Sequence, residues 1–468
     1  MKKRVLSMFM TLVLCLTLLP APVRAEETVC ICTDRCSEEM VNLDCPICSA
    51  ENADLSACLG KEAELPLMAA AASTEETISG NVTWENRNIT TPVTVKGDTT
   101  ITLKGENSIY QPATETTDKY DIDDDGTKDT VYEISNAGQL YWFAELVNGT
   151  LDGVEQNTLA NAILTANITV NENLLDSLQY DTEGNVSNGS DFISWTPIAD
   201  WMGNRTTQYS GTFDGNNKTV SGLYFNGDST CIGLFGSSES DGNIKNVGVV
   251  DSYFKGNDHV GGVCGNNAGT ITNCYNAGNL TAIESSATIG GICGYNNGGT
   301  VTNCYNTGTV TATGSVASVG GVCGCSTAPI SNCYNIGTVT ATSSSADISG
   351  ICGYNFGPIK NCYYLADTED ENGGKTAAQF ASGEIAYLLS QGCSTGEGDN
   401  TVTYDGSIWG QTIGTDTYPV LRGAKVYKNI TYFGCNDSSD VVSVAYSNED
   451  KTTYGDHDLS LIHISEPT

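Results

Sequence analysis

A sequence repeat with a period of 29 or 30 residues occupies the middle of this 468-residue chain. The copy that begins at Ile289 reads IGGICGYNNGGTVTNCYNTGTVTAT, and a degenerate copy begins at Ile232. The first cysteines of the four full copies are Cys264, Cys293, Cys323 and Cys352. The second cysteines are Cys274, Cys304, Cys333 and Cys362. One such short unit cannot bury its apolar side alone, so the repeat predicts an array in which stacked units cover one another.

Each copy contains three short segments rich in Thr, Val, Ile and Tyr, separated by Gly and Asn. The former residues favour β-strands, and the latter supply turn conformations with positive φ. Stacked coils place equivalent residues about 4.8 Å apart, so such residues form columns inside a β-solenoid. We expect one inward column to consist of Val263, Ile292, Val322 and Ile351. A second inward column should consist of Ile271, Val301, Ile330 and Ile359.

The repeats also resemble a known family, the GLUG motif of secreted and surface proteins in gut bacteria. The phrases that carry the resemblance are GGVCG, ITNCYNAG and VTNCYNTGTVT. Similar phrases extend upstream to YEISNAGQLYWFAELVNG and downstream to KTAAQFASGEIAYLLSQG. The resemblance implies a mainly β protein built on a right-handed parallel β-helix, located on a cell surface and adhesin-like. It implies no settled biochemical activity.

Composition and motifs divide the chain into consecutive regions. In the flanks of the solenoid we expect two short helices, one N-capped by Ser135 and ending near Gly149, the other spanning Ala377 to Leu389. The predicted regions are a signal peptide at 1–25, a small Cys-rich module at 26–60, a linker at 61–77, a β-strand region with an Asp-rich loop at 78–133, a capping α+β segment at 134–229, the GLUG-like β-solenoid at 230–366, a C-terminal capping segment at 367–424, the start of a truncated further domain at 425–458 and a sequence artefact at 459–468.

The two ends of the chain predict where it works. A basic start followed by the apolar run Val5–Leu19 is typical of a secretory signal, with cleavage expected after Ala25. No later stretch reaches the roughly 20 apolar residues of a membrane helix, so we expect a secreted or cell-surface protein without membrane insertion. The last residues, LSLIHISEPT, resemble translated sequencing adapter, so the natural protein is expected to continue past Asp458 and to carry any cell-wall attachment there.

The cysteines allow more than one interpretation. Six of them cluster near the N-terminus, at Cys30, Cys32, Cys36, Cys45, Cys48 and Cys58. In an exported segment this pattern favours a disulfide-stapled module, and a zinc site is the alternative because CxC and CxxC also have metal-ligand spacing. The solenoid cysteines are interpreted as buried thiols that serve packing. Disulfide pairing within one coil, as between Cys264 and Cys274, stays open.

An Asp-rich segment, DIDDDGTKD, is the sharpest candidate site. Its oxygen donors follow the spacing of a calcium-binding loop, and its glycine permits the sharp turn that brings them together. Tyr132 stands where a full EF-hand loop has its bidentate glutamate, so the segment resembles the looser loops of extracellular proteins. We expect a structural calcium ion, with a solvated acidic turn as the alternative. The predicted ligands are Asp121, Asp123, Asp125, Thr127 and Asp129.

Two further columns are expected on the solenoid. An asparagine precedes the second cysteine of every copy and should bond along the turns: Asn273, Asn303, Asn332 and Asn361. A tyrosine follows that cysteine and should project outward: Tyr275, Tyr305, Tyr334 and Tyr363. Such an aromatic column can stack on sugar rings, or its members can stack on one another for stability.

Charge and motif content restrict the function. The formal net charge of −35 excludes nucleic acid as a partner and suits divalent cations, glycans or other surface proteins. The chain has three histidines, and no Ser-His-Asp set or HExxH motif can be assembled, so no catalytic residue is expected. We therefore predict a non-enzymatic repeat protein, adhesin-like or stalk-like. The alternative is a carbohydrate-binding module protein, and a polysaccharide lyase or hydrolase is the least favoured.

Overall fold

The computed structural model describes the strands 76–79, 82–85, 93–96 and 101–104, and residues 110–201, 207–396, 401–432, 441–451 and 453–454. All of these lie in one compact unit, residues 68–468. The predicted signal peptide, Cys-rich module and sequence artefact lie outside the described residues, as does almost all of the predicted linker. Strand β1 (Glu76–Ser79) begins at the end of that linker.

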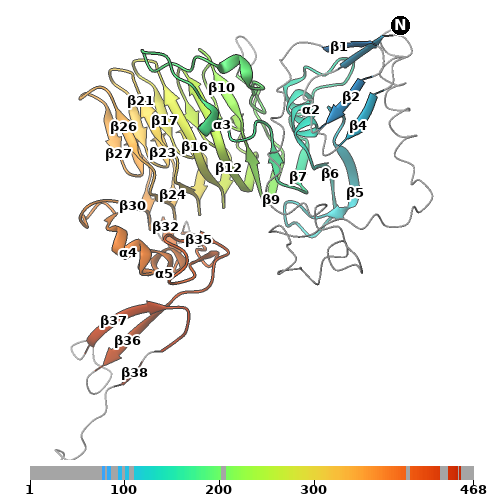
Figure 1. Cartoon of the computed structure of the whole chain (residues 1–468). Helices are drawn as coiled ribbons and strands as arrows, with labels where there is room; N and C mark the ends of the chain where they lie inside the picture. Colours follow the sequence, from blue (N-terminus) through green and yellow to red (C-terminus); the bar gives the residue numbers. More distant parts are fainter. Residues whose placement is uncertain are drawn as a thin grey trace, which may run out of the picture. The chain divides into compact units, whose positions relative to one another are not determined.

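The centre of the chain is a stack of coils with three parallel sheets, coloured green to orange in Figure 1. The sheet that we call the cysteine sheet is β11 (Phe235–Ser238), β14 (Cys264–Asn267), β18 (Cys293–Asn296), β23 (Cys323–Ser326) and β28 (Cys352–Asn355). The short sheet is β13 (Val260–Gly261), β17 (Thr288–Gly290), β22 (Ser318–Gly320) and β27 (Asp347–Ser349).

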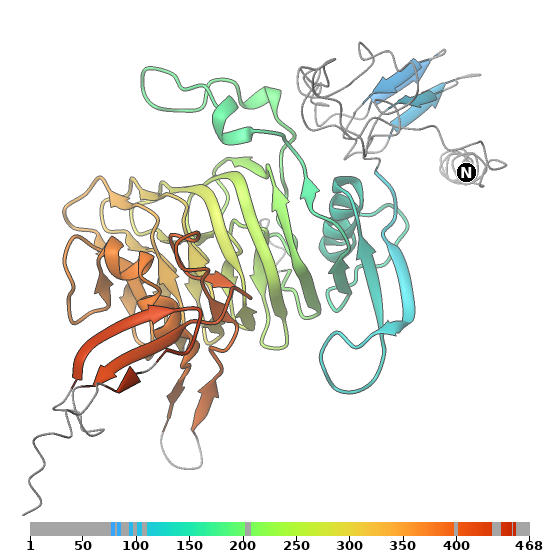
Figure 2. The same cartoon turned by 60° about the horizontal axis from the view of Figure 1, so that its bottom comes forward.

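The third sheet, which we call the long sheet, follows one side of the stack through all coils. Figure 2 shows its strands running side by side through the stack. Its solenoid strands are β9 (Thr212–Ser221), β10 (Tyr224–Asn226), β12 (Asn243–Gly256), β15 (Thr270–Thr272), β16 (Tyr275–Ala282), β19 (Thr300–Thr302), β20 (Tyr305–Asn306), β21 (Val310–Ala312), β24 (Ile330–Ser331), β25 (Tyr334–Asn335), β26 (Val339–Ala341), β29 (Ile359–Lys360) and β30 (Tyr363–Leu365).

The register confirms the predicted columns. Cys264 pairs with Cys293, Cys293 with Cys323, and Cys323 with Cys352. The valines and isoleucines of both predicted inward columns are buried through the first three copies, because each coil covers the next. In the last copy Ile351 is still buried, while Ile359 is only partly buried. The mainly β solenoid expected from the repeat is therefore the observed fold.

Asparagines also form columns inside the stack, and these were not predicted. Asn276, Asn306 and Asn335 are buried, and their side-chain amides donate along the column at 2.8 Å per step. Each amide also donates to a backbone carbonyl of its own turn, that of Gly278, Gly308 or Gly337. A second column joins Ser238, Asn267, Asn296 and Ser326 in the same way. Because every side-chain amide of these two columns has partners, the polar columns are compatible with the apolar core around them.

The segment upstream of the solenoid closes its first coils. Strands β5 (Thr114–Tyr120) and β6 (Asp129–Ile134) form a hairpin, and β6 extends the long sheet through β7 (Asn161–Leu164) and β8 (Ile168–Thr169). Helix α2 (Ala137–Asn148) packs its apolar residues on this core and ends at Gly149, whose φ is 68°. Shorter helices α3 (Leu174–Ser177) and η2 (Gly189–Asp191) follow.

The predicted cap of helix α2 was one residue early. Asn136 is the N-cap, and its side chain accepts a hydrogen bond of 3.0 Å from the amide of Gln139. Ser135 instead donates its amide and hydroxyl to the Gln139 side-chain oxygen. Two polar residues in succession compete for the same role, and the local pattern alone does not rank them.

The C-terminal capping segment, residues 367–424, begins with β31 (Gly374–Lys375), which extends the long sheet beyond β30. The single helix predicted from Ala377 to Leu389 is two helices, α4 (Ala377–Ala381) and α5 (Glu384–Ser390). The break falls at Gly383, whose φ of 88° ends the first helix. Two antiparallel pairs follow: β32 (Cys393–Thr395) with β33 (Val402–Tyr404), and β34 (Trp409–Gly410) with β35 (Val420–Leu421).

Short sheets also occur on both sides of these regions. Near the N-terminus β1 pairs with β3 (Val93–Lys96), and β2 (Val82–Glu85) pairs with β4 (Ile101–Lys104), both in parallel. After the C-terminal capping segment, β36 (Tyr427–Tyr432) lies between β37 (Val441–Ser447) and β38 (Thr453–Tyr454). The strands expected in the region from residue 78 are therefore present.

Candidate functional site

The Asp-rich loop is the turn of the hairpin formed by β5 and β6. Carboxylate oxygens of Asp121, Asp123 and Asp129 all lie within 4.8 Å of one another. Gly126, with a φ of 90°, makes the turn that a residue with a Cβ adopts only with strain. Its amide donates to Asp121 Oδ2 at 3.0 Å, while Asp121 Oδ1 is buried without a hydrogen-bond partner. Three of the five predicted ligands therefore converge, and their oxygen donors fit a hard divalent cation.

The other two predicted ligands, Asp125 and Thr127, bond to each other. Asp125 Oδ1 accepts from the amide of Thr127 at 2.7 Å and from its hydroxyl at 2.6 Å. The bond from the hydroxyl has the larger effect and the bond from the amide the smaller one, and together they lower the pKa of the exposed Asp125 carboxyl. Asp125 is thus held by its own turn and is not part of the group of three converging carboxylates.

A lysine of the first coil holds this loop on the solenoid. Lys245, on β12, donates its ammonium group to the carbonyl of Ile122 at 2.6 Å. It also forms ion pairs with Asp124 at 3.5 Å and with Asp214 at 4.0 Å. The loop and the lysine lie far apart in sequence, so the pattern of the loop gave no signal of this contact.

The tyrosine column stacks on itself. The rings of Tyr275 and Tyr305 lie 4.8 Å apart with an interplanar angle of 5°, and those of Tyr305 and Tyr334 lie 5.0 Å apart at 4°. Tyr363 continues the register of Tyr334, and its hydroxyl donates to Asn361 Oδ1 at 2.8 Å. The spacing follows directly from the distance between coils, since each coil contributes one ring.

The C-terminal capping segment covers much of this column. Trp409 lies 5.9 Å from the ring of Tyr305 and 5.4 Å from that of Tyr334. Phe380 lies 5.8 Å from Tyr334, whose hydroxyl donates to the carbonyl of Pro419 at 2.6 Å. Tyr334 is 1% exposed. The rings project from the sheet as predicted, but those of Tyr305, Tyr334 and Tyr363 pack in a second core, so the column does not offer four free faces to sugars.

The asparagine column beside the tyrosines is likewise used by the C-terminal capping segment. All four of its residues adopt a positive φ between 52° and 57°, the left-handed turn that the sequence indicates. Asn361 donates to Asn332 at 2.8 Å, as expected for a column. Asn303 and Asn332 instead donate to the carbonyls of Asp405 and Tyr404. In the middle coils the capping segment therefore takes the amides that were expected to bond along the turns.

The solenoid thiols are free and buried, as the packing interpretation predicts. Within the described residues all cysteines are free, and Cys393 is the one that is not fully buried. Cys304 and Cys333 donate to the carbonyls of Thr302 and Ser331, each at 3.1 Å. Burial raises the pKa of both thiols well above its usual value. A protonated, enclosed thiol is a poor nucleophile and metal ligand.

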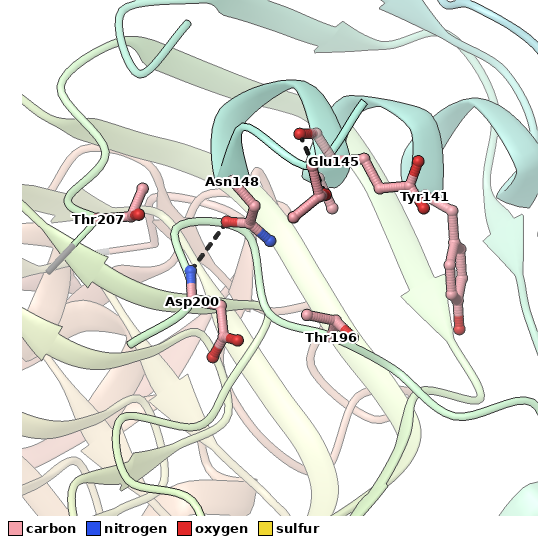
Figure 3. Close-up of a pocket in the computed structure, with 8 residues that line it drawn as sticks. Tyr141, Glu145, Asn148, Thr196, Asp200 and Thr207 are labelled. Carbon is pink, nitrogen blue, oxygen red and sulfur yellow. Dashed lines mark hydrogen bonds between the residues drawn. The ribbon is translucent and has the colours of Figure 1, made fainter. Parts of the chain in front are cut away.

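A cavity of about 270 Å³ lies between helix α2 and the chain near Asp200 (Figure 3). Asn148 fixes its wall by donating to the carbonyl of Pro197 and accepting from the amide of Asp200, each at 2.9 Å. Burial raises the pKa of Asp200 to about 6, and it also raises that of Glu145, which accepts a hydrogen bond from the Tyr110 hydroxyl. This cavity has no signal in the sequence, because its lining comes from three separate segments.

Three parallel sheets with in-register columns of like residues define a β-solenoid repeat protein. Residues 285–311, which cover most of the second full copy of the repeat, match the family model described as the GLUG motif. The resemblance read from the repeat phrases is thereby confirmed.

Two individual proteins are similar to parts of the chain. A stretch of 89 residues is 33% identical to Halomucin of Haloquadratum walsbyi, and it covers 18% of this chain and 1% of Halomucin. A crystal structure described as that of a "putative immunoglobulin A1 protease" from Bacteroides ovatus matches with a TM-score of 0.41 and 18% identity, over 63% of this chain and 92% of that one. Among the described helices, none is long and apolar enough to cross a membrane.

Proposed function

We propose that this protein is a non-enzymatic surface protein of adhesin or stalk type, whose solenoid is a rigid presenting element. The observation that carries the proposal is the in-register repetition of side chains from coil to coil. A catalytic centre needs different groups converging on one place, whereas stacked coils supply the same groups at regular intervals. Repeated weak contacts gain strength when several are engaged together. Glycans and other surface proteins, which suit an acidic exterior, are the partners we propose.

The cavity beside Asp200 gives the sharpest way to test the absence of catalysis. The purified chain would be offered to mucin, plant polysaccharides and surface proteins while binding and bond cleavage are measured in parallel. The proposal expects binding without turnover, and equal behaviour of Asp200→Asn and Glu145→Gln. A turnover that either substitution abolishes would overturn it. The exposed Asp152→Asn serves as the matched control.

We also propose a structural calcium ion at the Asp-rich loop. Its support is the group of three carboxylates together with the partnerless Oδ1 of Asp121. Calcium prefers such oxygen donors, and an ion there would neutralise charges that otherwise repel. Because the loop ends the hairpin that extends the long sheet, the ion would stiffen the N-terminal end of the stack. We expect no role for it in bond chemistry.

A further inference from the structure

Among the strands that the structure describes, two of the three solenoid sheets end at the last coil without a further neighbour. Within the described residues, β28 pairs on one side with β23, and β27 pairs on one side with β22. The other end is closed: β11 is bridged by Ile198 and Tyr209, and β13 by Ile232. The long sheet continues past its last coil to β31. An edge strand left in this way presents unpaired amide and carbonyl groups that can pair with another chain.

Apolar side chains are exposed at this edge because no coil follows. Ile348 stands in the column of Val260, Ile289 and Val319, which are all 0% exposed, yet it is itself 50% exposed. Tyr354 is 47% exposed, and Phe356 is 68% exposed and packs edge to face on it at 4.8 Å. The last coil therefore exposes apolar side chains, and the equivalents of Ile348 in the earlier coils are buried under the next coil. The outermost orange strands of the stack in Figure 1 include β27.

Charge identifies the occupant that can approach this edge. The whole chain carries a formal charge of −35, so two copies repel over most of their surface. The stretch 319–360, which forms the last two coils, contains Asp347 as its one acidic residue and Lys360 as its one basic residue. The strand segment ICGYNF, at 351–356, contains no charge and no proline. Natural proteins protect free edges with charged residues and prolines, and β28 lacks that protection.

We propose that two copies of this chain associate end to end through β27 and β28. A two-fold axis that crosses β28 brings this strand against its own copy, and the two strands then run antiparallel and exchange backbone hydrogen bonds. The same operation places Ile348, Tyr354 and Phe356 of one copy against the apolar edge of the other. β28 carries no charge, so it meets its own copy without like-charge repulsion, and the contact needs no second kind of surface. The pair is a double-length rod with its N-terminal hairpins at opposite ends.

The test is sedimentation equilibrium of the full chain from about 1 µM to about 1 mM, a range that includes weak dimers. The weight-average mass should rise toward that of a dimer, and X-ray scattering should show a longer maximum dimension. The double variant Tyr354→Lys with Phe356→Lys places charges at the edge and should weaken association at least ten-fold. Val316→Lys is the matched control, because Val316 is also an exposed apolar residue but belongs to the turn of an earlier coil.

Circular dichroism of both variants separates a lost contact from a lost fold. A wild-type chain that stays monomeric over the whole range would leave the edge to a strand of another protein and would overturn the proposal. Dimers that persist unchanged in the double variant, or that Val316→Lys weakens equally, would also overturn it. Growth beyond the dimer would contradict the two-fold arrangement, because a contact of that kind closes on itself.

Discussion

The side-chain amide of Asn276 donates a hydrogen bond of 2.8 Å to the side-chain carbonyl of Asn306, one coil further on. Asn306 repeats the same bond to Asn335 at 2.8 Å. The column ends at Tyr364, which stands in register with Asn335 where a further asparagine would continue it. A polar residue in the middle of the stack therefore has its partners supplied by the coils before and after it.

Asn306→Ala should lower the free energy of unfolding by about 2–3 kcal/mol, because it leaves buried amide and carbonyl groups of its neighbours unpaired. Urea unfolding followed by circular dichroism measures the change. Asn297→Ala, at an exposed position of the same coil, should change stability by less than about 0.5 kcal/mol. Equal effects of the two substitutions would show that the hydrogen bonds of the column do not contribute to stability.

Thiol reactivity should follow burial. Burial raises the pKa of Cys304 and Cys333 well above its usual value, and it raises that of Cys393, which is partly exposed. At pH 8 the buried thiols stay protonated, so iodoacetamide with peptide mapping should modify Cys393 first and leave the two others unmodified. Addition of urea should make all three react. Rapid modification of Cys304 in the folded protein would contradict the buried column.

Asp200 should make stability depend on pH. Burial raises its pKa to about 6, above the value of about 3.9 in an unfolded chain. The folded state therefore binds the proton more tightly, and the stability gained from this group is present below about pH 4 and lost as pH rises through about 6. Asp200→Asn should raise the free energy of unfolding by about 1–2 kcal/mol at pH 7.5 and leave it unchanged at pH 4. The exposed Asp152→Asn should show no such difference.

Calcium binding should depend on the three converging carboxylates. Titration calorimetry of the chain should give a dissociation constant on the order of 0.1–1 mM, as in other extracellular sites. Asp121→Asn together with Asp123→Asn should abolish the heat of binding. Asp125→Asn should weaken binding less, because its carboxylate already accepts two bonds from Thr127. No heat and no rise in melting temperature at about 10 mM calcium, far above that range, would exclude the site.

The sequence predicts the solenoid well because the repeat states the same residues four times. The period determines the register, and the alternation of Val or Ile with Gly and Cys determines which side chains face inward. The buried Asn276 column also has a signal in the sequence, since the phrase NCYN recurs in the first three copies.

Contacts between distant segments were beyond the sequence pattern. Trp409 lies 75 positions after Tyr334, and nothing in the local phrase IWGQ indicates that its ring covers the tyrosine column. The contact of Lys245 with the Asp-rich loop likewise joins distant segments, and no local pattern indicates it. The last coil differs again: Ile348 looks like its buried equivalents in sequence, and only its place at the end of the stack exposes it.

The C-terminal capping segment runs back along the stack and bonds to several coils. Arg422 donates to Asn246 of the first coil at 2.9 Å. The carbonyls of Asp405, Tyr404 and Leu388 accept from Asn303, Asn332 and Asn361 of three later coils. An open repeat array can gain or lose a unit by recombination, since every neighbour is replaced by an equivalent one. Here a gained or lost coil would change the distance between Asn246 and the later asparagines, so the capping segment could no longer bond to both. The number of coils is thus fixed by a segment outside the repeats, and relatives with longer stacks should carry a correspondingly longer or differently placed return segment.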